Sequence, residues 1–245
     1  MNLVDVLYTL KDHEEFQVSN DFNNFFNFCV PLLKRTKSQS FQDLFVLYEY
    51  GTMNEGYFVD FGAYDGVQDS NTYLLEKEYG WKGLCVEPNQ ELFNSLWNNR
   101  KCLIGTSCVY DKTGEELPFT IIEDSKVLST LNEFIHADYN SGLRNVSNKR
   151  IEKVLTVTLY DLLEQNSSPR DIDYISVDTE GSELRILRKF FEENHNKYKV
   201  KLWTIEHNYN DGVRKAIHDL MTSQGYERVL VEYSRWDDFY KRSDY

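Results

Sequence analysis

Short apolar runs alternate with helical stripes along most of this sequence. Four runs predict buried strands, at 57–61, 83–87, 173–178 and 201–206. After the third run, Leu184, Leu187 and Phe190 repeat at helical spacing, and a further helical stripe covers 213–221. Strands that alternate with helices in this way form a mostly parallel sheet with helices on both faces. The pattern therefore predicts an α/β fold.

Two stretches depart from this alternation. Residues 102–110 and 117–122 read as a strand and its antiparallel partner around a turn at Lys112–Gly114. The polar segment 123–150 follows, and a connection of this length is usually functional, so we expect it to face the substrate. The alternative is a solvated surface excursion. A last strand at 226–231 leads to a tail at 236–240.

The N-terminal fifty residues lie outside the alternation. They carry three apolar helical stripes, at 3–10, 22–33 and 44–48, the second interrupted by Pro31. We therefore divide the chain into an N-terminal helical extension, 1–50, and a catalytic domain, 51–245. The extension could cover the mouth of the site or pair two subunits as a homo-oligomer, and the sequence leaves both open.

The stretch from Tyr57 to Gly66 predicts a strand that ends in a ligand-binding turn. Asp60 closes the strand, Gly62 and Gly66 permit a tight turn, and a helix begins beyond Ser70-Asn71-Thr72. Nucleotide-like cofactors bind at this end of the first strand in open α/β sheets. The next strand ends in Glu87, placed to bind ribose hydroxyls. An ordinary turn with a solvated glutamate is the alternative, since the full dinucleotide-binding glycine pattern is absent.

Acids also end the later predicted strands. Asp178 and Glu206 occupy these positions, and His207 follows directly. Because the carboxyl ends of parallel strands share one edge, we expect these residues to meet Asp60 and Glu87 in one crevice. His207 could act as general base toward an acceptor hydroxyl. In a second scheme, Asp178, Glu206 and His207 hold Mg²⁺ or Mn²⁺, which lowers the pKa of the acceptor.

Composition narrows the classes of partner. The 245 residues carry a net charge of −13, which argues against a nucleic-acid ligand. No apolar run is long enough to span a membrane, and the first residues lack the basic region of a signal peptide, so we expect a cytoplasmic protein with no membrane partner. The four cysteines form no C-x-x-C pair, which leaves a zinc site unsupported.

With these residues in view, the chain resembles the FkbM family of S-adenosylmethionine-dependent methyltransferases from about residue 38 onward. Six blocks carry the resemblance in family order: 40–46, 58–66, 70–76, 80–88, 173–183 and 205–208, with 178–183 the most specific. The resemblance implies a Rossmann-like class I methyltransferase sheet, mostly parallel with one antiparallel strand. It also implies cofactor contacts within this set: Asp60, Gly62, Asp65 at the same turn, Asn71, Glu87, and Thr106 or Ser107 near the adenine.

The resemblance further implies transfer of a methyl group from S-adenosylmethionine to a hydroxyl. Sugars, glycans and polyketides are the acceptors it suggests, and we expect a small-molecule sugar, nucleotide-linked or otherwise a glycan precursor. An acidic crevice suits the sulfonium cation of this cofactor by Coulomb attraction. Three alternatives stay open: a polyketide or other small-molecule hydroxyl, a nicotinamide-dependent oxidoreductase, and a catalytically dead binding module. The missing third glycine argues against the oxidoreductase, and the intact acids argue against the dead module.

Overall fold

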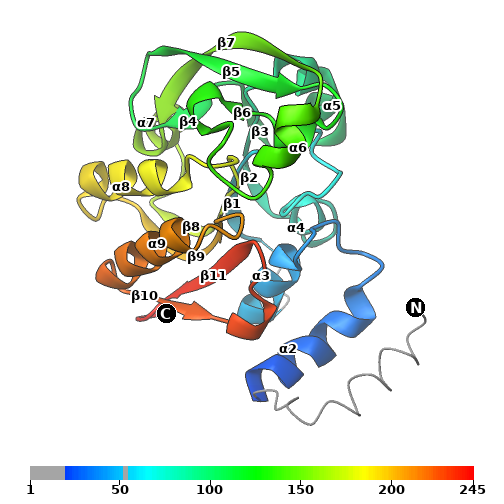
Figure 1. Ribbon diagram of the computed structural model, residues 1–245. Helices are drawn as coiled ribbons and strands as arrows, with labels where there is room; N and C mark the ends of the chain where they lie inside the picture. Colours follow the sequence, from blue (N-terminus) through cyan, green and yellow to red (C-terminus); the bar gives the residue numbers. More distant parts are fainter. Residues whose placement is uncertain (1–19, 52–54) are drawn as a thin grey trace.

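A seven-stranded sheet forms the centre of the molecule. The computed structural model describes residues 20–51 and 55–245 (Figure 1). Within them the strand order of the sheet is β10-β11-β9-β8-β1-β2-β3. These strands are β1 (Tyr57–Phe61), β2 (Lys82–Val86), β3 (Leu103–Gly105), β8 (Asp171–Val177), β9 (Lys199–Glu206), β10 (Tyr226–Val229) and β11 (Asp237–Arg242). Strand β1 lies between β2 and β8, so the chain order reverses beside it and creates a switch point.

The predicted fold class, a mostly parallel sheet with one antiparallel strand, is confirmed. Strands β1, β2, β3, β8 and β9 pair in parallel, whereas β11 pairs antiparallel with both β9 and β10. Strand β11 is formed by the segment that the sequence pattern presented as a tail after the last strand. The sequence does not reveal this strand, because a half-buried strand is recognised by alternating apolar and polar residues, whereas Asp237 to Tyr240 are all buried.

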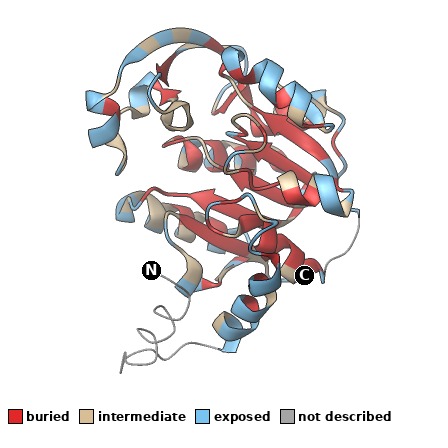
Figure 2. Ribbon diagram, turned by 90° about the vertical axis from the view of Figure 1, so that its right-hand side faces the viewer, coloured by how far each residue is buried: buried red, intermediate tan, exposed pale blue. Residues whose placement is uncertain are grey.

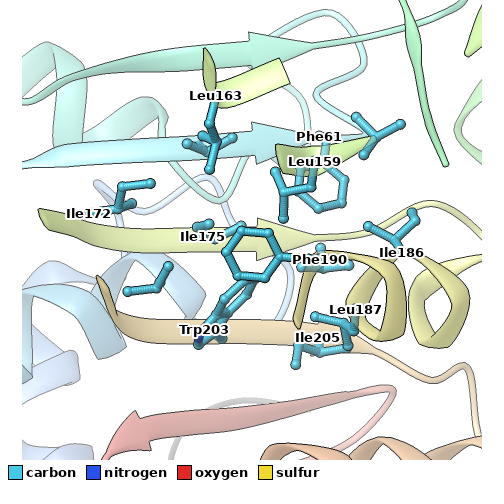
Figure 3. Packing of buried hydrophobic residues seen from close by; sticks show 14 of the residues in the cluster. Phe61, Leu159, Leu163, Ile172, Ile175, Ile186, Leu187, Phe190, Trp203 and Ile205 are labelled. Carbon is cyan, nitrogen blue, oxygen red and sulfur yellow. The ribbon is translucent and has the colours of Figure 1, made fainter. Parts of the chain in front are cut away.

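Helices cover both faces of the sheet. One face packs against α7 (Leu159–Gln165), α8 (Glu183–Asn194) and α9 (Asp211–Ser223), and the other against α2 (Asn20–Cys29), α3 (Gln42–Tyr50), α4 (Tyr73–Tyr79) and α5 (Phe93–Asn99). In β1, Val59 and Phe61 belong to the first core and Phe58 to the second. Figure 2 shows the buried strands between more exposed helices. In Figure 3, Phe190 of α8 packs against Trp203 of β9, with ring centroids 5.7 Å apart.

A smaller sheet lies above the large one and corrects the predicted hairpin. Its strands are ordered β4-β7-β5-β6, with bounds β4 (Cys108–Tyr110), β5 (Glu116–Ile122), β6 (Thr130–Leu131) and β7 (Lys149–Thr158). The predicted pairing of 102–110 with 117–122 is wrong, because β7 separates β4 from β5 and the chain leaves β3 for a different sheet before β4. Between β5 and β7 the chain forms η3 (Lys126–Leu128), η4 (Asn132–Phe134) and α6 (Ser141–Val146).

The described part of the N-terminal extension belongs to the core. Helix α3 buries Leu44, Phe45, Val46 and Leu47 completely beneath the sheet. Helix α2 and η1 (Val30–Leu32) extend beyond it, and Phe25 packs edge-on against Tyr233. The apolar stripe at 3–10 lies outside the described residues. The division at residue 50 and the role of the extension in oligomerisation stay predictions.

No helix among the described residues is both long and apolar enough to cross a membrane.

Gly62 fixes the distance between the two central strands. Its φ of +88° lies in the left-handed region, and a Cβ at this position would lie 1.7 Å from the carbonyl oxygen of Asp178. The amide of Asp178 in turn donates to the carbonyl oxygen of Phe61 at 3.3 Å. The ends of β1 and β8 can therefore meet only if residue 62 has no side chain.

We expect Gly62→Ala to destabilise the protein far more than a glycine change elsewhere. Gly114, with φ +84° and no atom within 4 Å of a built Cβ, is the matched control. Gly114→Ala should lower the free energy of unfolding by about 1 kcal/mol, the effect of the backbone conformation alone. Gly62→Ala should lower it by roughly 3 kcal/mol or more, because main-chain atoms must also move. Urea unfolding of both variants measures the difference, and equal losses would show that the strand ends are not in contact.

Candidate active site

One large pocket opens at the carboxyl ends of the central strands. Its volume is about 660 Å³, within the range of small-molecule sites. Strands β1, β2, β8 and β9 each contribute residues at or just beyond their ends, and the small sheet and the η3–α6 segment close the opposite side. Of the predicted site residues, the lining includes Asp60, Gly62, Asn71, Glu87, Ser107, Asp178 and Glu206. The pocket thus occupies the switch-point crevice that the strand order predicts.

The first half of the pocket is built by the turn after β1. Asp60 is buried and accepts a hydrogen bond from the Thr72 hydroxyl at 2.6 Å, while burial raises its pKa. The side-chain Nδ2 of Asn71 donates to the Ser176 hydroxyl at 2.9 Å, but its Oδ1 is buried and has no partner within 20–51 and 55–245. A buried acceptor without a partner is unfavourable, so Asn71 is suited to bind a ligand donor.

Glu87 links the turn after β1 to the turn after β2. One carboxylate oxygen accepts the Tyr64 amide at 3.0 Å and the other accepts the Asn89 amide at 2.8 Å. Burial raises its pKa to about 7, against the lowering effect of these two hydrogen bonds. Glu87 therefore holds both turns while facing the pocket, and each carboxylate oxygen keeps a lone pair for a ligand hydroxyl.

A buried arginine, not predicted from the sequence, organises this half of the pocket. The guanidinium of Arg100 donates to the Gly66 carbonyl, the Ser70 and Thr72 hydroxyls and the Glu76 carboxylate, at 2.7 to 3.2 Å. The Thr72 hydroxyl in turn donates a hydrogen bond to the Asp60 carboxylate. Arg100 thus ties the whole segment between β1 and α4 to the end of β1.

Two predicted cofactor residues lie outside the pocket lining. Asp65 accepts the amides of Val67 and Gln68, both at 2.8 Å, and so stabilises the turn itself. Thr106 is exposed and does not line the pocket, whereas its neighbour Ser107 does. Of the two residues suggested for the adenine, the structure places Ser107 at the pocket.

The second half of the pocket contains a cluster of carboxylates. Among the described residues, oxygens of Asp178, Glu180 and Glu206 lie within 4.8 Å of one another. Burial is the main cause that raises the pKa of each, and for Asp178 and Glu206 the pKa lies well above its ordinary value. Glu206 is 5% exposed, and its Oε2 has no hydrogen-bond partner in the described part of the chain. We call these three residues the acidic cluster.

A second buried arginine neutralises part of the acidic cluster. The fully buried guanidinium of Arg144 contacts Glu180 and Asp138, the latter at 2.7 Å, and also donates to the Leu128 carbonyl at 2.9 Å. Asn208 donates to the same Glu180 oxygen at 3.0 Å. These contacts fix Glu180 and draw the η3–α6 segment to the end of β8. The predicted substrate-facing segment therefore does border the pocket, through residues that include Leu128.

The structure does not bring His207 to the acidic cluster. Its side chain is buried outside the large pocket and lines a separate cavity of about 20 Å³. Its Nδ1 accepts the Tyr209 amide at 3.2 Å, and its Nε2 lies 3.8 Å from Asp238. Burial lowers its pKa to about 4, although Asp238 acts in the opposite direction. Glu180 takes the place in the cluster that we predicted for His207, and His207 instead accepts the Tyr209 amide.

Three aromatic side chains line the same pocket as the acidic cluster. Tyr139, Tyr209 and Trp236 line the pocket, with ring centroids 5.7 Å apart for the tyrosines and 6.3 Å apart for Tyr209 and Trp236. Tyr139 is 75% exposed and Tyr209 is 48% exposed. Core packing does not account for large aromatic rings held at the mouth of a pocket. We call these three residues the aromatic rim.

Unfavourable backbone conformations gather around the pocket. Five non-glycine residues in its lining have positive φ, namely Tyr64, Asp69, Glu180, Asn208 and Tyr209. Such conformations persist where the surrounding structure enforces them, and they often occur at functional sites. Here they aim the residues of the acidic cluster and the aromatic rim.

Some of these residues carried a signal in the sequence. Glu180 and Asn208 lie within the blocks 173–183 and 205–208, which resemble the family and also contain the predicted site residues Asp178 and His207. Arg100, Arg144 and Tyr139 had no such signal, because only the folded chain brings them to the strand ends.

The comparisons with known proteins identify the family. The profile of the methyltransferase FkbM domain matches residues 60–228, more than half of the chain. The chain therefore belongs to the FkbM methyltransferase family. No curated protein sequence matches it.

Solved methyltransferase structures show a distant likeness. A human methyltransferase 10 domain containing protein aligns at 13% identity over 92% of this chain and 99% of that one, with a TM-score of 0.44. A Pyrococcus furiosus methyltransferase aligns at 10% identity over 91% and 97%, with a TM-score of 0.41. TrmK of M. capricolum, solved with S-adenosylhomocysteine, aligns at 11% over 80% and 65%, with a TM-score of 0.38. Likenesses this distant do not bear on the substrate.

We expect Glu76→Gln to remove a charge pair that holds the first half of the pocket. Burial raises the pKa of Glu76, but Arg100 and hydrogen bonds lower it further, to about 2 from an ordinary 4.5. Because the folded-state pKa is depressed, the stability from this charge is present above about pH 4.5 and is lost as the pH falls toward 2. The variant should be less stable by about 3 kcal/mol at pH 7, and the difference should shrink below pH 4.5.

Glu78→Gln is the control, because Glu78 is on the same helix and its pair with Arg35 is exposed. It should change the free energy of unfolding by less than about 0.5 kcal/mol. Urea unfolding between pH 7 and pH 3 compares both variants with the wild type. A Glu76→Gln effect that does not vary with pH would contradict the charge pairing.

Proposed function

We propose that this protein transfers a methyl group from S-adenosylmethionine to a hydroxyl of a sugar. Family membership supports methyl transfer, and the aromatic rim beside the acidic cluster is the single observation that favours a sugar acceptor. Aromatic faces pack against the apolar C–H face of a sugar ring, and carboxylates and amides bind its hydroxyls. Both kinds of group are present at the mouth of this pocket.

The residues of the first half fit the cofactor. Gly62 leaves the backbone bare, Asn71 offers an unpaired acceptor to the cofactor amino group, and Glu87 faces the pocket to bind ribose hydroxyls. The cofactor supplies a methyl group on a sulfonium, and acidic surroundings favour this cation. A nicotinamide cofactor has less support, because the matched family is a family of methyltransferases.

Methyl transfer to a sugar requires the hydroxyl to lose its proton. The C–O bond forms as the C–S bond breaks, the sulfonium leaves as a neutral thioether, and the hydroxyl proton must pass to a base. Asp178 and Glu206 are the bases that we propose, because both are carboxylates that line the pocket. The proposed step therefore does not use His207, which lies in a separate cavity.

The acceptor can be free, glycan-linked or nucleotide-linked. Among the described lining residues Lys126 is the basic one, and its ammonium already pairs with Glu91 at 2.5 Å. A diphosphate would have to compete with this pair. The net charge of −13 also disfavours a nucleic-acid acceptor.

Incubation of the protein with S-adenosylmethionine and a panel of glycosides, nucleotide-linked sugars and polyketides tests the proposal. We expect a mass gain of one methyl group on a sugar. Tyr209→Ala should raise the acceptor KM about fivefold, the effect of losing roughly 1 kcal/mol of aromatic contact, without changing cofactor affinity. Trp97→Ala, which removes an exposed ring outside the pocket lining, should leave KM unchanged. Methylation of polyketide hydroxyls alone, or equal effects of the two variants, would contradict a sugar acceptor.

A further inference from the structure

The acidic cluster lacks enough positive charge among its own contacts. It contains three carboxylates, and the guanidinium that touches it, Arg144, is shared with Asp138. Asp237, another buried acid, adds to the negative charge around Asp178 and Glu206. Three carboxylates this close cannot all remain ionised in a buried site without a cation.

The hydrogen bonds leave particular oxygens free. Glu180 uses Oε2 for Arg144, Asn208 and Asn140, so its Oε1 is left for another partner. Glu206 has an exposed fraction of 5% and lines the large pocket, and its Oε2 has no hydrogen-bond partner among the residues that the structure describes. This buried, unpartnered oxygen is a second observation, separate from the clustering of three acids. A buried polar atom without a hydrogen-bond partner indicates a ligand that would satisfy it.

We propose that Asp178, Glu180 and Glu206 bind one divalent cation of the Mg²⁺ or Mn²⁺ type. A set made only of oxygen ligands suits these hard cations, which keep several waters besides one or a few carboxylates. The charge of +2 balances the charges of two carboxylates, and the guanidinium of Arg144 already pairs with the third, that of Glu180. This set differs from the one expected from sequence, because Glu180 replaces His207.

The position of the cation gives it a role in the proposed reaction. The cluster lines the same pocket as Gly62 and the aromatic rim, so a bound cation would face the space in which we expect the acceptor hydroxyl. A divalent cation there lowers the pKa of a nearby hydroxyl, so that its proton passes to a carboxylate oxygen that the cation leaves free. This role rests on the proposed function, whereas binding of the cation does not.

Titration of the full-length protein with Mn²⁺, followed by electron paramagnetic resonance of free Mn²⁺, tests the site directly. We expect one saturable Mn²⁺ per chain, measured with and without S-adenosylhomocysteine, and competition by Mg²⁺. Glu180→Gln and Glu206→Gln should each weaken Mn²⁺ binding at least tenfold. Glu91→Gln, which removes an exposed acid that pairs with Lys126, should leave it unchanged.

Thermal unfolding of each variant confirms that it is folded, and Glu206→Gln provides a second reading if Glu180→Gln disturbs Arg144. Absence of saturable Mn²⁺ binding to the wild type, or equal binding by all three variants, would overturn the proposed site. Methyl transfer that continues at full rate in EDTA would overturn its catalytic role while leaving the methyltransferase assignment intact. Mn²⁺ binding without methylation of any sugar would instead support the site and contradict the proposed acceptor.

Discussion

The contact between the end of β1 and the end of β8 is the constraint on which this site depends. Gly62 touches the Asp178 carbonyl so closely that no side chain fits between them. The contact sets Asp60 and Asp178 on neighbouring strands around one pocket, although more than a hundred residues separate them in the sequence. Without it, the turn after β1 and the acidic cluster would not share one cavity.

Two buried arginines brace the two halves of that pocket. Arg100 gathers the segment after β1 through the Gly66 carbonyl, two hydroxyls and Glu76. Arg144 gathers the η3–α6 segment through Leu128, Asp138 and Glu180. A guanidinium suits this work because its fork of donors can satisfy several acceptors from one buried position. The strand ends provide the site, and the arginines hold the intervening segments against it.

Much of the first half of the site could be predicted from sequence. The carboxyl end of a buried strand, a glycine turn and an acid on the next strand have fixed relative positions in an open α/β sheet, so local pattern predicts that Gly62 and Glu87 lie at the pocket. Asn71 was expected from the family resemblance, and it also lines the pocket. The second half depended on long-range contacts. His207 follows the end of β9 as expected, but its side chain packs beneath the strand end toward Asp238, and the position in the cluster goes to Glu180.

The fold shows the same division between local and distant information. Strands that alternate with helices were recognised, since each produces its own apolar period. Most of the predicted tail at 236–240 lies in β11, where its aspartates are buried and accept hydrogen bonds from distant side chains. Asp237 accepts from the Gln42 amide at 2.9 Å, and Asp238 accepts from the Arg214 guanidinium at 2.7 Å. No local period can reveal a strand whose polar residues are satisfied by distant side chains.

Calorimetric titration shows directly whether this pocket binds S-adenosylmethionine. The wild type should bind S-adenosylmethionine with a one-to-one stoichiometry and should show no saturable binding of NAD. Glu87→Ala should weaken the affinity by about 1–3 kcal/mol, the effect of losing a buried hydrogen-bond partner. Saturable binding of NAD alone would contradict S-adenosylmethionine as the cofactor. An affinity for S-adenosylmethionine that Glu87→Ala leaves unchanged would contradict binding in this pocket through Glu87.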